Sequence, residues 1–184
     1  MNVPCMITRK NANGTEIPFE FRRCTAEHLS AIAALQERIV RVLPTPELFA
    51  RTTEAELAES LELDFCLGAY AGGTLAMVSI MVSNRISPRN LGVYLGYEEA
   101  RLLQTVTYDT TFVDPAFRGY GLQRLSFRFK DAEAAALGAR EALATVAPDN
   151  DASLHNLLAD GFAEVDRQSL YGGLDRMILR KTLE

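Results

Sequence analysis

The chain has 184 residues, of which 48% are hydrophobic, and its formal net charge at pH 7 is −5. These values predict one globular domain over residues 1–184 and argue against broad, non-specific binding of nucleic acid. The cysteines Cys5, Cys24 and Cys66 lack CxxC and metal-ligand spacing, so we expect reduced thiols and no metal. Because the apolar runs are too short to span a bilayer, we expect a cytoplasmic monomer or homodimer without a membrane partner.

The first half of the chain predicts a strand, two helices and a β-hairpin. Residues 17–22 have strand character, and Thr25 fits the N-cap of a helix that ends at Pro44. Thr53 and Glu56 have the spacing of a capping box at the start of a second helix. A glycine-rich turn predicts that strands 65–70 and 74–82 form the hairpin, and 84–97 is expected to be a loop.

The second half predicts alternating strands and helices. A long strand is expected over 103–113, and apolar residues from Leu122 to Ala136 recur at helical spacing before Gly138. A strand over 141–147, a helix from Asp149 or Asn150 to Asp160, and strands over 162–167 and 176–180 complete the list. The element order is β, α, α, β, β, β, α, β, α, β, β. We therefore expect an α/β (α+β) fold with a central mixed, mostly antiparallel sheet of about seven strands flanked by four helices.

The segment from Val113 to Gln123 has the features of an anion-binding turn. Gly119 and Gly121 lack a Cβ atom, so the chain can bend tightly and bring successive backbone N–H groups toward one anion. A helix that begins at Tyr120 or Gly121 adds further N–H groups and the positive end of its dipole. Positive charge near this turn is expected from Arg118, Arg124, Arg128 and Lys130.

This segment resembles the signature of the GNAT superfamily of acyl-CoA-dependent N-acyltransferases. The signature has Arg or Gln, two residues, Gly, one residue, and Gly or Ala, after a strand that ends in Val-x-Pro. Residues Val113-x-Pro115 and Arg118, Gly119, Tyr120, Gly121 and Leu122 fit it, whereas Gln123 occupies the last small position. Asn150, Ser153 and the Gly161-Phe162 pair resemble a second motif of the superfamily.

The resemblance implies a binding site for acetyl-CoA as co-substrate. The pyrophosphate would bind the backbone of residues 118–123, and the backbone of Phe112 and Val113 would pair with the pantetheine arm. Asn150 would bond to that arm, and Ser153 belongs to the same predicted site. A plain N-cap role for Asn150 is compatible with this one.

The catalytic groups are less defined by sequence. Asp109 is the only carboxylate in its strand and can act as a base, bind a cationic substrate, or face solvent. Many members of the superfamily have a tyrosine that protonates the leaving thiolate where this chain has Leu157. Either Tyr108 or His155 replaces it, or the thiolate leaves unassisted.

The implied function is transfer of an acetyl group from acetyl-CoA to a primary amine, by direct attack in a ternary complex. The acceptor is expected to be a small molecule or a peptide. An alternative is a non-catalytic module of the same fold that binds acyl-CoA or another partner, which Leu157 and Gln123 favour. A third possibility is transfer of an acyl group other than acetyl.

Overall fold

The computed structural model describes residues 3–183 and divides them into two compact units. Unit 1 contains residues 3–43, 51–80 and 110–129, and unit 2 contains residues 44–50, 81–109 and 130–183. The strands belong to an eight-stranded sheet in the order β1-β2-β3-β4-β5-β6-β8-β7. Strands β4 and β5 and helix α4 each contribute residues to both units.

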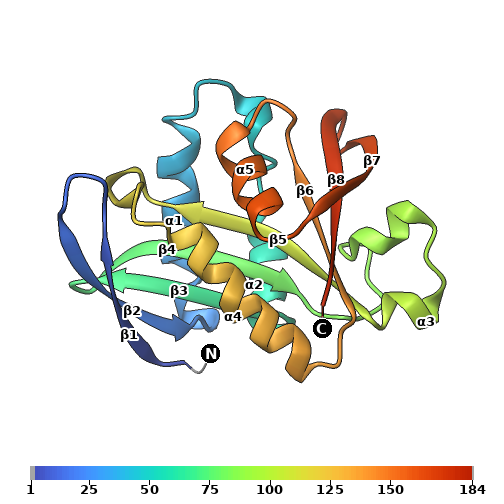
Figure 1. Ribbon diagram of the computed structural model, residues 1–184, viewed down its shortest axis with the longest axis horizontal. Helices are drawn as coiled ribbons and strands as arrows, with labels where there is room; N and C mark the ends of the chain where they lie inside the picture. Colours follow the sequence, from blue (N-terminus) through green and yellow to red (C-terminus); the bar gives the residue numbers. More distant parts are fainter. Residues whose placement is uncertain (1–2, 184) are drawn as a thin grey trace. The chain divides into compact units, whose positions relative to one another are not determined.

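The elements follow one another along the chain as drawn in Figure 1. The strands are β1 (Cys5–Lys10), β2 (Glu16–Arg23), β3 (Phe65–Ala71), β4 (Thr74–Val82), β5 (Thr105–Val113), β6 (Glu141–Val146), β7 (Ala163–Leu170) and β8 (Leu174–Thr182). The α-helices are α1 (Leu29–Val40), α2 (Glu54–Leu63), α3 (Glu99–Leu102), α4 (Leu122–Ala136) and α5 (Asp151–Ala159). Within residues 3–183, no helix combines the length and the apolar character needed to cross a membrane.

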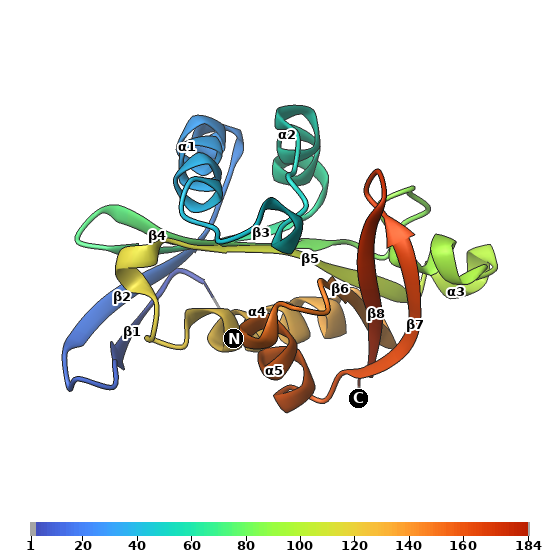
Figure 2. The same ribbon diagram turned by 90° about the horizontal axis from the view of Figure 1, so that it is seen from above.

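Unit 1 is built on antiparallel pairs of β1 with β2 and of β2 with β3. Helices α1 and α2 lie on one face of β3 and β4, and α4 begins on the opposite face (Figure 2). Residues of β3 and β4 are therefore buried almost throughout, as expected for strands covered on both faces.

Aromatic side chains of β2 pack against the segment that leads into α4. Phe21 stacks on Phe129 with ring centroids 5.1 Å apart. Phe19 makes edge contacts with Phe117 and Tyr120, at centroid distances of 5.9 and 5.6 Å. These contacts hold the residues around the predicted anion-binding turn against a rigid strand.

Unit 2 combines one parallel pair of strands with two antiparallel pairs. Strand β5 runs parallel to β6, with Thr105 opposite Glu141 and Tyr108 opposite Ala144, where the pairing ends. Strand β8 pairs antiparallel with both β6 and β7. Helix α4 connects β5 to β6 and so supplies the crossover that a parallel pair requires, whereas α5 connects β6 to β7.

The predicted fold class is confirmed, with three differences in detail. The sheet has eight strands and not about seven, and the additional strand is β1. Its side chains alternate only between half-buried and exposed, so its apolar pattern in the sequence is weak. Thr25 caps a one-turn 3₁₀-helix (Ala26–His28), and α1 begins after it at Leu29. The predicted loop over 84–97 contains a 3₁₀-helix (Leu91–Leu95), and α3 follows it. The single domain expected over 1–184 stays a prediction.

Candidate functional site

The turn after β5, in unit 1, is fixed by Asp114. Its carboxylate accepts a hydrogen bond from the backbone N–H of Ala116 at 3.0 Å and caps a 3₁₀-turn (Pro115–Phe117). The other carboxylate oxygen accepts hydrogen bonds from Nε and Nη2 of Arg38 in α1, at 3.1 and 3.0 Å. Asp114 also donates its backbone N–H to the carbonyl of Ala76 in β4. The chain therefore enters the glycine segment from a defined position.

Two glycines then bring the chain into α4. Gly119 and Gly121 have φ values of +83° and +69°, in the left-handed region that favours glycine. The backbone N–H of Leu125 bonds to the carbonyl of Gly121, so α4 begins at Leu122 rather than at Tyr120 or Gly121. The first N–H groups of a helix have no carbonyl partner within it, and the helix dipole is positive there. This end of α4 is therefore suited to bind an anion such as a pyrophosphate.

Tyr120, between the two glycines, has a structural role. Its side chain is buried against Phe19, and its hydroxyl accepts a hydrogen bond from Nδ2 of Asn11. Its backbone carbonyl accepts a hydrogen bond from Nε of Arg9 in β1, at 3.0 Å. The predicted contribution of this residue to cofactor binding can therefore come from its backbone.

Arg9 is a functional candidate outside the residues predicted from the sequence. A Cβ atom added to Gly121 would lie 2.9 Å from Nη2 of Arg9, so the guanidinium borders the glycine of the turn. It brings a positive charge to this part of unit 1. The available sequence signal was Asn13-Gly14, a common hairpin turn that indicates a strand on either side.

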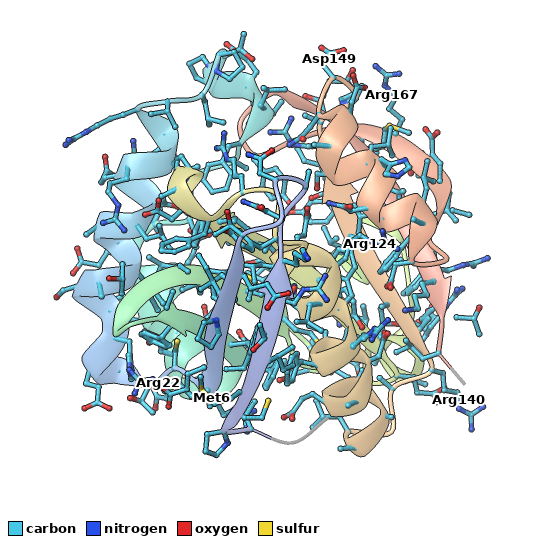
Figure 3. The ribbon with its side chains drawn as sticks, turned by 60° about the vertical axis from the view of Figure 1, so that its left-hand side comes forward. Met6, Arg22, Arg124, Arg140, Asp149 and Arg167 are labelled. Carbon is cyan, nitrogen blue, oxygen red and sulfur yellow. The ribbon has the colours of Figure 1, made fainter. Side chains whose placement is uncertain are left out.

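The basic side chains expected near the turn separate into two groups. Arg118, Arg124 and Arg128 are exposed, and Arg124 projects from the first turn of α4 (Figure 3). Lys130 is only 1% exposed, and its ammonium lies over the ring of Tyr108 in unit 2, at 5.0 Å. The expectation that Lys130 adds surface charge near the turn is therefore wrong, because it points into the protein.

Phe112 is buried and Val113 is half-buried at the end of β5.

Tyr108, in unit 2, is engaged in a partly buried polar network. Its hydroxyl donates a hydrogen bond to the carboxylate of Asp131, which also accepts two hydrogen bonds from Nζ of Lys181. Burial, together with the charge of Asp131, raises the pKa of Tyr108 far above its usual range. A hydroxyl that holds its proton so firmly is a poor acid, so this geometry does not favour Tyr108 as the proton donor.

Asp109 lies on the opposite face of β5 from Tyr108, because successive side chains of a strand alternate. Its carboxylate accepts a hydrogen bond from Nη2 of Arg89 at 2.7 Å. The two side chains are 20% and 11% exposed, so the pair is partly open to solvent. A carboxylate paired with a guanidinium accepts a proton less readily. The pairing therefore disfavours action of Asp109 as a general base, and its binding of a cationic substrate stays a prediction.

Tyr171, in the turn between β7 and β8, adds a hydroxyl near Asp109. It shares a hydrogen bond of 3.0 Å with the hydroxyl of Thr145. Burial of the hydroxyl and the charge of Asp109 raise the pKa of Tyr171 to about 12, against the lowering effect of the bond to Thr145. The ring itself is partly exposed, at 44% for the residue. The sequence signal was the Tyr-Gly-Gly turn, in which Tyr171 itself has a positive φ of 52°.

The second predicted motif, also in unit 2, spans α5: Asn150 and Ser153 lie at its start, and the Gly161-Phe162 pair follows its end. The side-chain oxygen of Asn150 accepts a hydrogen bond from the backbone N–H of Ser153 at 3.2 Å, so Asn150 is the N-cap. This bond uses the oxygen and not the Nδ2 group, so a contact of Nδ2 with a cofactor stays a prediction. Leu157 is 4% exposed, and His155 lies on the surface.

The surroundings of the α5 start are charged. Figure 3 shows Asp149, just before α5, near Arg167 of β7, and the charge of Asp149 acts on Arg167. Arg167 is itself paired with Asp175. Among residues 3–183, no three His, Cys, Asp or Glu side chains gather closely enough to hold a metal ion.

The comparisons with known proteins identify the fold. No family model and no curated protein matches the chain. An acetyltransferase of the GNAT family from Streptococcus pneumoniae has a TM-score of 0.68 and 17% identity, over 90% of this chain and 99% of that one. The yncA protein of Salmonella typhimurium, solved with its cofactor acetyl-CoA, has a TM-score of 0.67 and 20% identity, over 90% and 94% of the two chains.

A third similar structure is the ribosomal-protein-S18-alanine N-acetyltransferase from Escherichia coli. It has a TM-score of 0.67 and 17% identity, over 90% of this chain and 94% of that one. At these identities the likeness concerns the fold. The resemblance of the sequence motifs to the GNAT superfamily is thereby confirmed at that level, and the chain has the fold of the GNAT-family acetyltransferases.

Proposed function

We propose that the chain is an N-acetyltransferase that transfers an acetyl group from acetyl-CoA to a primary amine by direct attack in a ternary complex. The observation that carries this proposal is the turn with Gly119 and Gly121 in left-handed conformations at the start of α4. Further support is the shared fold with acetyltransferases, one of them solved with acetyl-CoA. The proposal includes a cytoplasmic protein, active as a monomer or homodimer on a small-molecule or peptide amine.

In this proposal the cofactor pyrophosphate binds the backbone of residues 118–123. Arg118 and Arg9 supply positive charge, and the exposed side chain of Arg118 can reorient to contact the phosphates. By resemblance to the superfamily, the backbone of Phe112 and Val113 pairs with the pantetheine arm, and Asn150 and Ser153 belong to the same cofactor site.

The reaction requires three proton movements: the acceptor nitrogen loses two protons, and the leaving thiolate gains one. The ammonium form of the acceptor loses a proton to solvent, and its nitrogen then forms a bond to the thioester carbonyl carbon as the carbon–sulfur bond breaks. The amide nitrogen releases its second proton, and the thiolate takes up one to give free coenzyme A. A thiol with a pKa of about 8.5 is a good leaving group, so the thiolate can depart without the tyrosine that Leu157 replaces.

A non-catalytic module that binds acyl-CoA is the second candidate. It is favoured by the buried Leu157, which offers no hydroxyl, and by Gln123 at the position of a small residue. Such a module would bind the cofactor without releasing its thiol in the presence of an amine.

Calorimetry followed by thiol-release assays separates these functions. Wild-type protein would first be titrated with acetyl-CoA, and release of the thiol would then be measured with amines, amino acids and N-terminal peptides. Saturable binding with turnover supports the transferase, whereas binding without turnover across a broad panel supports the module. The absence of acetyl-CoA binding would contradict both.

A further inference from the structure

One face of the sheet in unit 2 carries polar side chains where an apolar core would be expected. Thr107 pairs with Leu143, so alternation places Asp109 of β5 and Thr145 of β6 on the same face. Thr145 pairs with Ile178 of β8, so alternation places Arg176 on that face as well. Three adjacent strands therefore each contribute a polar side chain to it.

The hydroxyl of Tyr171 connects these groups. It bonds to Thr145, and both the negative charge of Asp109 and the positive charge of Arg176 act on it. Asp109 and Arg176 are distant in the sequence, yet the strand register places both on the face that carries Thr145, the partner of this hydroxyl. We call Asp109, Thr145, Tyr171 and Arg176 the polar face.

Arg176 is the unusual member of the polar face because its charge is buried. The residue is 4% exposed, and its Nη1 and Nη2 atoms donate hydrogen bonds to the backbone carbonyls of Asp175 and Glu47, each at 2.8 Å. Among residues 3–183, no carboxylate is hydrogen-bonded to it. Asp175 acts on it through its charge, but that carboxylate is paired with Arg167.

A buried guanidinium without a bonded carboxylate is costly for stability, since neutral carbonyls replace only part of its lost hydration. Burial accordingly lowers the pKa of Arg176. A ligand carboxylate would supply the missing charge, and arginine is suited to bind it through parallel hydrogen bonds. The polar face thus has a place for an anionic group.

Asp109 supplies the opposite charge on the same face. Asp109 accepts a hydrogen bond from Arg89, and a carboxylate has two oxygens that can each accept more than one hydrogen bond. A contact with the ammonium group of a ligand is therefore compatible with the bond from Arg89.

We propose that the polar face binds the acetyl acceptor, and that the acceptor is an amine that also bears a carboxylate, as in an amino acid. Asp109 receives its ammonium group, and Arg176 receives its carboxylate. This inference rests on the proposed acetyl transfer and specifies the acceptor class for it.

Matched acceptors test the inference directly. Each amino acid would be compared with its own carboxamide, which keeps the amine and side chain but lacks the negative charge. Wild-type protein is expected to give a value of kcat/KM at least about tenfold higher for the acid, the effect of one charge-assisted contact. Arg176→Gln should abolish this preference while turnover of the carboxamide persists. Arg180→Gln, an exposed position on the same strand, is the control and should keep the preference.

Two results would overturn the inference. If the wild-type protein has equal values of kcat/KM for the carboxamide and the acid, the acceptor does not need a carboxylate. This comparison requires no variant. An Arg176→Gln variant that is folded and keeps the preference would show that another group binds the carboxylate. Failure of the wild type to bind acetyl-CoA contradicts the proposed function instead. Titration of amino acids into the protein alone then still tests the polar face: binding that Arg176→Gln removes supports it, and no binding overturns it.

Discussion

Arg9 and Tyr120 are 111 residues apart in the sequence, and Nε of Arg9 donates a hydrogen bond of 3.0 Å to the backbone carbonyl of Tyr120. This bond joins β1 to the peptide that precedes Gly121, at the turn proposed to bind the cofactor phosphates. Strand β1 therefore takes part in the site even though it lies outside the motif that indicated the site.

Replacement of Arg9 by alanine should weaken the binding of acetyl-CoA by about tenfold, corresponding to ~1.4 kcal/mol. The variant loses both the bond that orders the turn and a positive charge near the phosphates. Affinity for acetyl-pantetheine, which lacks the pyrophosphate, should change less. Lys10→Ala on the same strand removes an exposed charge and should leave both affinities unchanged. Equal losses for the two ligands would contradict a contact with the phosphates.

Gly121→Asp should abolish the binding of acetyl-CoA without unfolding the protein. The new carboxylate would repel the pyrophosphate. Nη2 of Arg9 would lie only 2.9 Å from the added Cβ, so the end of this flexible side chain must shift to make room, and its guanidinium can then pair with the carboxylate in the folded state. Strain at the positive φ should lower the free energy of unfolding by about 1–2 kcal/mol. Gly138→Asp is the matched control, because Gly138 also has a positive φ, 71°, with open space around it. We expect the two variants to have comparable thermal stability, and only Gly138→Asp to bind acetyl-CoA. Binding of acetyl-CoA by Gly121→Asp would show that the pyrophosphate binds elsewhere.

Glu141→Gln should destabilise unit 2 most strongly near neutral pH. Burial favours protonation of Glu141, but the hydrogen bonds from Arg101 and Thr105 outweigh it and lower the pKa below its ordinary value of 4.5. The stabilisation is therefore complete above that value and is lost as the pH falls through the lowered pKa. We expect a loss of about 1–3 kcal/mol in the free energy of unfolding near pH 7. Chemical denaturation as a function of pH checks this, and a difference that stays constant into acid would contradict it.

Tyr171→Phe should reduce kcat/KM by a factor that is independent of pH. With its pKa raised to about 12, chiefly by burial, the hydroxyl of Tyr171 stays protonated through the assay range. Removal of one hydrogen bond of about 1 kcal/mol predicts a loss of roughly fivefold. Tyr97→Phe serves as the control, since the ring of Tyr97 lies against Arg101, at 3.6 Å. A change in the shape of the pH–rate profile on loss of Tyr171 would mean that this phenol titrates during the reaction.

Local patterns in the sequence predicted the elements that depend on local interactions. The Thr53–Glu56 capping box is present at the start of α2, because both partners lie within one helical turn. Strand β4 has the predicted bounds, since its apolar residues form a continuous run. The glycines of the turn before α4 were likewise recognisable because their backbone conformation requires them.

Contacts between distant residues were not predictable in the same way. The pairing of Asp109 with Arg89 depends on how the loop over 84–97 folds against β5, which no periodicity specifies. Lys130 was assigned to the surface because a charged residue on a helix usually lies there, but the path of α4 directs it over Tyr108. The position of Arg9 at the turn depends on β1, and the weak apolar pattern of this strand does not identify it in the sequence.

Calorimetric titration of the wild-type protein with acetyl-CoA tests the central claim most directly. We expect saturable binding at one site per chain, with a dissociation constant of about 1 μM to 1 mM, and weaker binding of acetyl-pantetheine because it lacks the phosphates. The same titration of Gly121→Asp should show no binding. Absence of saturable binding in the wild type, or equal affinity of the wild type and Gly121→Asp, would contradict an acetyl-CoA site at the start of α4.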